Sequence, residues 1–222
     1  MIPESIAASA AKRLVDDVNH FGHLTTGFLG TPLLCQALTD NGYPEIAYKL
    51  LFNKRYPSWL YPVTKGATTI WERWDGIKPD GSFQDVGMNS FNHYAFGAVG
   101  AWMYNYSLGI LRDDNSPGFK HFILQPEPDA TEQMTFAKGY YDSMYGRIES
   151  SWEIKNATCY YRFVVPPNTS ATVYLSAQNK KDVIINSKKR SIEFLRMENS
   201  KAVFKLVSGV YSFETSLIKF KN

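Results

Sequence analysis

The sequence predicts a multidomain α-then-β fold, with helices first and an antiparallel β-sandwich after them. Apolar residues recur at helical spacing in the first half of the chain, and short alternating β-rich runs fill the second half. Residues 112–118 between the two halves are polar and rich in turn formers. We therefore expect two domains, residues 1–112 and residues 113–222, each with its own core.

Three helices are expected before residue 52, because apolar side chains recur every three or four positions there. The first covers residues 3–19. In the second, Thr31 and Pro32 are typical of an N-cap and a first helical residue, and the third starts at Pro44. The second and third helices should form an antiparallel hairpin. The expected buried residues are Ile6, Ala10, Leu14 and Val18, then Leu33, Leu34, Ala37 and Leu38, then Ile46, Ala47, Leu50 and Leu51.

Residues 53–89 have a different character, because prolines and Asp-Gly turn pairs interrupt them and three of the five tryptophans lie there. A loop of this length inside a compact domain is uncommon and is more often functional than a neutral connection. We therefore expect the functional site in this segment.

The residues after Ser90 carry the strongest helical pattern of the chain, which extends to residue 106. Its opposite side holds His93, Phe96, Gly97 and Gly100, so both faces of this helix should meet protein or a lined cavity. The expected apolar stripe is Phe91, Tyr94, Ala95, Ala98, Val99, Trp102, Met103 and Tyr106.

The second half contains short β-rich runs that are separated by Asn, Ser, Pro and Gly, as in an antiparallel sandwich. The expected strands are residues 147–152, 160–165, 171–175, 183–185 and 202–207.

Composition narrows the possible partners. The net charge of +3 is too slight and too dispersed for phosphate-backbone binding, so nucleic acid is not expected. The most apolar stretch is interrupted by Asn105 and glycines, which favours a buried helix over a membrane span. Cys35 and Cys159 lie in different predicted domains and are expected as reduced thiols. His20 and His23 lack a third ligand nearby, so we expect neither a metal nor a cofactor.

Glu72 is the candidate catalytic residue, because it lies between Trp71 and Trp74 in the loop segment. Glycoside hydrolysis commonly uses two carboxyl groups, and neighbouring tryptophans can stack on sugar rings. The alternative is structural, with Glu72 forming an ion pair with Arg73 or another base between core tryptophans. Spacing alone leaves both readings open.

The other polar residues of the segment also have two interpretations. Asp75 and Asp80 precede glycines and are typical turn formers, and Asp85 is a third rival carboxylate. His93 would suit a hydrogen bond to a sugar hydroxyl, but the pattern alone favours a core histidine whose hydrogen bonds are satisfied within the protein.

Several motifs together resemble the bacterial α-L-rhamnosidases of glycoside hydrolase family 78, over nearly the whole chain. They are residues 24–32 (LTTGFLGTP), 40–43 (DNGY), 56–62 (YPSWLYP), 66–75 (GATTIWERWD), 90–94 (SFNHY) and, for the family's β-sandwich, 142–146 (DSMYG) with Trp152. The resemblance implies a partial (α/α)6 toroid, its last helical hairpins, followed by the sandwich.

The resemblance further implies an inverting hydrolase that removes terminal α-L-rhamnose, with Glu72 as general base and His93 as a sugar contact. The family's general acid belongs to a motif upstream, for which this sequence has no counterpart. The implied partners are a rhamnose-containing oligosaccharide or glycoside and the upstream part of the same enzyme. The compartment stays open between bacterial cytoplasm and export. A non-catalytic carbohydrate-binding or assembly module, and an inactive gene fragment, are the rival hypotheses.

Overall fold

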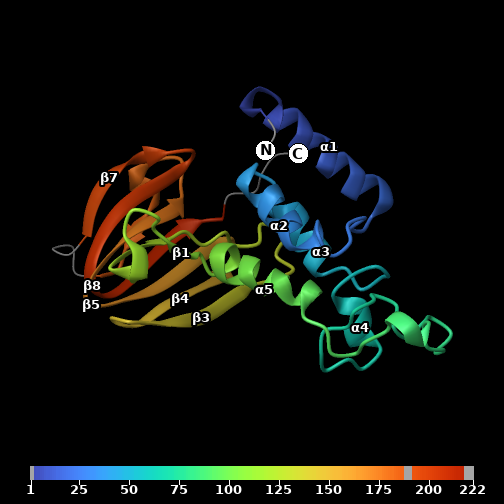
Figure 1. The fold of residues 1–222 in the computed structure, drawn as a ribbon. Coiled ribbons are helices and arrows are strands. Elements are labelled where there is room, and N and C mark those ends of the chain that lie inside the picture. The colour runs from blue at the N-terminus through green and yellow to red at the C-terminus, as the bar shows by residue number, and fades with distance from the viewer. Residues whose placement is uncertain (1–2, 188–191, 218–222) are drawn as a thin grey trace. The chain divides into compact units, whose positions relative to one another are not determined.

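The computed structural model describes residues 3–187 and 192–217. The chain forms two compact units, which we call the helical unit (Met1–Trp102) and the β unit (Met103–Asn222) (Figure 1). The division falls before residue 112 because strand β1 (Ile110–Arg112) hydrogen-bonds to β2 (His121–Leu124) within the β unit. The expected fold class, helices followed by a mostly antiparallel β domain, is confirmed.

Helix α1 (Glu4–Phe21) begins directly after Pro3 and ends at Gly22. The φ of Gly22 is 70°, a left-handed conformation that glycine adopts without steric cost, and its N–H donates to the Val18 carbonyl over 2.8 Å. The buried residues Ala11, Val15 and Val18 follow helical spacing. The buried face of α1 therefore contains Ala11 and Val15 in place of the expected Ala10 and Leu14, a shift of one position along the helix.

Helices α2 (Thr31–Asp40) and α3 (Pro44–Leu51) form the expected hairpin. Thr31 is the first helical residue rather than the N-cap, and its hydroxyl donates to the Thr26 carbonyl. The core of the hairpin contains four of the expected residues and adds Tyr48, whereas Leu33 is exposed. Those four are Leu34, Leu38, Ala47 and Leu50.

The region expected as the strongest helix is shorter and less regular than its pattern predicted. It becomes helical at Ala95, with a 3-10 turn (Ala95–Ala98), then α5 (Val99–Trp102) and a π-helical turn (Met103–Ser107). Tyr94 of the predicted stripe is exposed, and Phe96 from the opposite side is buried instead. Among the described residues, no helix is both long and apolar enough to cross a membrane.

The β unit contains one hydrogen-bonded sheet of eight strands among its described residues. The remaining strands are β3 (Phe136–Ser143), β4 (Gly146–Lys155), β5 (Thr158–Ser176), β6 (Ile184–Ile185), β7 (Ile192–Glu198) and β8 (Lys201–Ser216). All pairings are antiparallel except β2 with β5. The sequence runs at residues 160–165 and 171–175 are two parts of the single strand β5.

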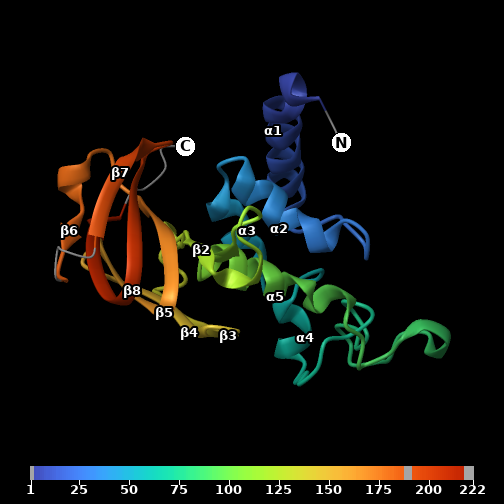
Figure 2. The same cartoon turned by 60° about the vertical axis from the view of Figure 1, so that its left-hand side comes forward.

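The single sheet folds into a two-layer sandwich, because the long strands β5 and β8 each pass from one layer into the other. The first layer has the order β3, β4, the start of β5, the end of β8, and β6. The second has the order β1, β2, the end of β5, the start of β8, and β7. A register shift between Val165 and Ser170 separates the two parts of β5, and Figure 2 shows both strands curving through the unit.

Both layers contribute to one apolar core, as the alternation of buried residues along the strands requires. Trp152 on β4 is 1 % exposed, and its indole Nε1 donates to the Ser107 carbonyl over 2.6 Å. Aromatic contacts at 5.8–6.1 Å connect Phe163, Phe213 and Phe204. The burial of these rings, with the other apolar residues of the core, stabilises the unit.

Gly109 provides a direct test of this packing. Its φ is +71°, and an added Cβ would lie 2.0 Å from the Pro126 nitrogen and 2.1 Å from the Gln125 carbonyl carbon. We expect Gly109→Ala to lower the free energy of unfolding by at least about 2 kcal/mol, because backbone must move to make room. Urea unfolding followed by tryptophan fluorescence measures this.

Gly118→Ala is the matched control, since Gly118 has a φ of +82° but its nearest neighbour is the Met144 sulfur at 4.0 Å. It should cost only the backbone strain, about 1 kcal/mol. Equal losses in the two variants would contradict the close approach at Gly109.

Candidate active site

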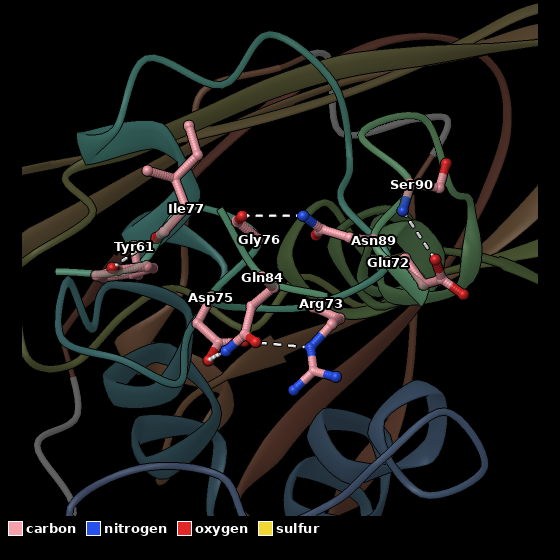
Figure 3. A network of polar contacts seen from close by, with 9 residues as sticks. All are labelled: Tyr61, Glu72, Arg73, Asp75, Gly76, Ile77, Gln84, Asn89 and Ser90. Atoms are coloured by element: carbon pink, nitrogen blue, oxygen red, sulfur yellow. Dashed lines mark hydrogen bonds and ion pairs between the residues drawn. The ribbon is translucent and has the colours of Figure 1, made fainter. Parts of the chain in front are cut away.

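The loop at residues 53–89 contains little regular structure, as expected. It holds the short helix α4 (Leu60–Thr64), a 3-10 turn (Val86–Met88) and an isolated antiparallel bridge between Ile77 and Phe83. Hydrogen bonds fix it instead. The Tyr61 hydroxyl donates to the Ile77 carbonyl over 2.9 Å, and the Asn89 amide donates to the Gly76 carbonyl over 3.1 Å (Figure 3).

Glu72 is held by Ser90 through two reciprocal hydrogen bonds. The Glu72 N–H donates to the Ser90 carbonyl over 2.8 Å. The Ser90 N–H in turn donates to Glu72 Oε2 over 2.8 Å, as Figure 3 shows. Among the described residues, Oε1 accepts no hydrogen bond. One carboxylate oxygen is thus fixed by the backbone, while the other is left available to a ligand.

Arg73 does not pair with Glu72, which was the structural alternative for this carboxylate. Its Nε lies 3.5 Å from Asp75 Oδ1, and the Gln84 amide donates to Asp75 Oδ2 over 2.5 Å (Figure 3). Asp75 therefore joins both branches of the loop and has its own partners. The charge of Glu72 is not neutralised by its neighbour.

The two tryptophans beside Glu72 contact other aromatic rings of the helical unit. Trp71 is 5 % exposed and meets Phe91 edge-on, with ring centroids 4.9 Å apart. Trp74 stacks on Phe96 at 3.7 Å and meets Trp59 at 5.6 Å. These contacts fix the backbone on both sides of Glu72. The sugar contacts expected of Trp71 and Trp74 stay a prediction.

His93 lies just before the helical residues rather than in a first helical turn. Its ring Nδ1 accepts from the Ala95 backbone N–H over 3.3 Å. The backbone N–H of His93 donates to the Ile70 carbonyl over 2.8 Å. Since Nδ1 is the acceptor, the neutral imidazole carries its proton on Nε2. Phe28 stacks on the ring at 5.2 Å. The imidazole is therefore oriented and presents Nε2–H as a donor.

The rival carboxylates have local structural roles. Asp80 Oδ1 accepts from both the N–H and the hydroxyl of Ser82, and these bonds lower the pKa of Asp80. Asp85 caps the 3-10 turn by accepting from the Gly87 N–H over 2.7 Å. Asp80 is thus a turn residue and Asp85 a cap residue, each bonded to atoms two positions along the chain, whereas Glu72 bonds to Ser90 at the far end of the loop.

Sequence reasoning missed the residues that orient Glu72 and His93. Ser90 holds Glu72 through its backbone while its hydroxyl accepts from the Asn92 N–H over 3.1 Å, and a serine in such a turn does not by itself indicate contact with a residue 18 positions away. Phe28 lies in the motif at residues 24–32, far from His93 in sequence, so its stacking on the imidazole depends on the tertiary fold. Phe96 was expected on the side opposite the apolar stripe of a regular helix. The chain forms a 3-10 turn there instead, and Phe96 is buried.

Comparisons with known proteins identify the family of this chain. Residues 1–107 match the bacterial alpha-L-rhamnosidase 6 hairpin glycosidase domain, and residues 109–190 match the bacterial alpha-L-rhamnosidase C-terminal domain. An alpha-L-rhamnosidase of Streptomyces avermitilis is 40 % identical over 96 % of the chain, and one of Formosa agariphila is 37 % identical over 96 %.

The crystal structure of the Streptomyces avermitilis alpha-L-rhamnosidase complexed with L-rhamnose superposes with a TM-score of 0.88, at 40 % identity over 97 % of the chain. The chain spans 20 % of the Streptomyces relative and 23 % of the Formosa relative. The chain corresponds to the end of the six-hairpin glycosidase domain and to the C-terminal domain of these relatives. It therefore belongs to the bacterial α-L-rhamnosidase family.

Proposed function

We propose that the chain supplies the general base of an inverting α-L-rhamnosidase, and that this base is Glu72. The observation that carries the proposal is the asymmetric binding of its carboxylate, with Oε2 fixed by the Ser90 N–H at 2.8 Å and Oε1 without a partner among the described residues. A general base needs a fixed orientation and an open acceptor atom within reach of the proton it removes. The Glu72 carboxylate meets both needs.

In the proposed reaction, Glu72 Oε1 takes a proton from a water molecule as the water oxygen attacks the anomeric carbon of a terminal α-L-rhamnose. The bond from that carbon to the glycosidic oxygen breaks on the opposite side, and the leaving oxygen takes a proton from a second carboxyl group. In inverting enzymes the two carboxyl groups lie about 6.5–9.5 Å apart. We place the second group in the part of the relatives that the chain does not span.

We assign His93 a binding role. Its Nε2–H is oriented to donate to a sugar hydroxyl, because the Ala95 N–H occupies Nδ1 and Phe28 supports the ring. Such a bond positions the rhamnose so that the anomeric carbon meets the water held by Glu72. This is a positioning effect and involves no proton transfer.

Glu72→Gln tests the base. We expect it to lower kcat on an aryl α-L-rhamnoside by about 10²- to 10⁴-fold, since glutamine has the same shape but cannot accept the proton. The assay uses a chimera in which this chain replaces the matching fifth of the Streptomyces avermitilis rhamnosidase. The chain alone is assayed beside it.

Glu153→Gln removes the same charge from exposed β4 and serves as the control, with unchanged kcat expected. In Glu72→Ala, azide should restore turnover of the activated substrate, because azide attacks without losing a proton. An unimpaired Glu72→Gln enzyme, or loss of activity that azide does not relieve, would refute the role of Glu72 as base.

His93→Phe tests the positioning role. Phenylalanine keeps a ring against Phe28 but has no donor, so we expect kcat/KM to fall about 5- to 10-fold, the value of one hydrogen bond. His93→Gln, which retains a donor, should recover part of the loss. Steady-state kinetics of the same chimera measure both, and equal values for wild type and His93→Phe would rule out the contact.

A further inference from the structure

The outer face of the first layer of the β unit carries a regular array of aromatic and polar side chains. The register places Phe136, Glu153, Tyr160 and Glu214 in one row across β3, β4, β5 and β8. A second row contains Lys138, Ser151, Arg162 and Ser212. Because side chains alternate between faces along each strand, all eight point away from the core.

This face is hollowed. A depression of about 530 Å³ is lined by Phe136, Tyr160 and Asn186, together with Lys138, Ser151 and Arg162. A second depression of about 560 Å³ shares these last three residues and extends toward Tyr140. The two therefore form one trough that crosses the strands, and it lies wholly within the β unit.

Two aromatic rings in the trough, those of Phe136 and Tyr160, remain accessible to solvent. Phe136 is 63 % exposed and Tyr160 is 41 % exposed. They lie two strands apart with Glu153 between them, which corresponds to about 9.5 Å along the row. Tyr140 is different, because the Arg147 guanidinium lies 3.7 Å over its ring. Phe136 and Tyr160 are thus the open platforms on which a flat apolar surface can stack.

The charges of the face neutralise one another. Arg162 pairs with Glu149 at 2.6 Å, and Lys155 pairs with Glu153 at 2.7 Å. Arg147 pairs with Asp142 at 2.8 Å. A balanced face of this kind lacks the net positive charge that nucleic acid or an anionic membrane requires. The cores of protein interfaces are depleted of charged residues, so a protein partner also fits poorly.

From these features we infer that the trough is a second carbohydrate site, which binds a neutral oligosaccharide independently of Glu72. Phe136 and Tyr160 stack on the C–H faces of separate sugar units, two strands apart. Lys138, Ser151, Arg162 and Asn186 supply hydrogen-bond partners for the hydroxyl groups between and beside these rings. The ligand is uncharged, polar at its edges and apolar on its faces, which matches the residues that line the trough.

The test is an NMR and calorimetric titration of the whole 222-residue chain with neutral tetrasaccharides of glucose, xylose, galactose or rhamnose. At least one should bind and shift the amide signals of Lys138, Ser151 and Arg162. Phe136→Ala and Tyr160→Ala should each weaken binding about 2- to 10-fold, the value of one stacking contact, and the double variant should abolish it.

Tyr141→Ala is the matched control, because Tyr141 is also 41 % exposed but lies on the other side of β3 and contacts Phe119. The Tyr141→Ala variant should bind the tetrasaccharide with unchanged affinity. Hydrolysis of a small aryl rhamnoside by the Phe136→Ala and Tyr160→Ala chimeras should equal that of the unmodified chimera. The inference is overturned if no tetrasaccharide binds, if Tyr141→Ala weakens binding equally, or if the chimera loses the binding that the chain shows.

Discussion

The reciprocal pair of hydrogen bonds between Glu72 and Ser90 is the constraint on which the candidate site depends. It joins the two ends of the loop at residues 73–89, so the order of this loop and the orientation of the carboxylate have one cause. The contacts of Asp75 with Arg73 and Gln84 brace the same loop from inside. Ser90 contributes backbone atoms to the pair, and its hydroxyl accepts from the Asn92 N–H over 3.1 Å, which supports the local turn that presents these atoms.

The two units are stabilised in different ways. The β unit has one continuous core, since β5 and β8 run through both layers and place Phe163 and Phe204 in the same apolar cluster. The helical unit buries fewer apolar residues and leaves Leu29, Leu33, Val86 and Tyr94 exposed. Of these four residues, Leu33 lies on α2, and the other three lie in loops or in a 3-10 turn.

The fold was predicted well where a signal is local. Apolar spacing and the proline and glycine positions located α1, α2 and α3 to within a few residues, and alternation found β4, β5 and β8. Strand β3 was missed because its glycine and charged residues weaken the pattern, and β2 because it has only four residues, too few for a clear alternation. The helix after Ser90 failed because Gly97 and Gly100 disfavour a regular helix, and Phe96 is buried by stacking on Trp74. Glu72 and His93 were proposed as site residues from motifs and stay a prediction, whereas their contacts with Ser90 and Phe28 depend on the tertiary fold.

The anomer released first by the Streptomyces chimera distinguishes the two possible roles of Glu72, because a base that activates water and a carboxylate that attacks carbon give opposite products. Proton NMR of the Streptomyces chimera during the first turnovers of an aryl α-L-rhamnoside distinguishes them before mutarotation. A general base at Glu72 predicts that β-L-rhamnose appears first and the α-anomer accumulates later. Initial release of α-L-rhamnose would show that the reaction retains configuration and would contradict the role of Glu72.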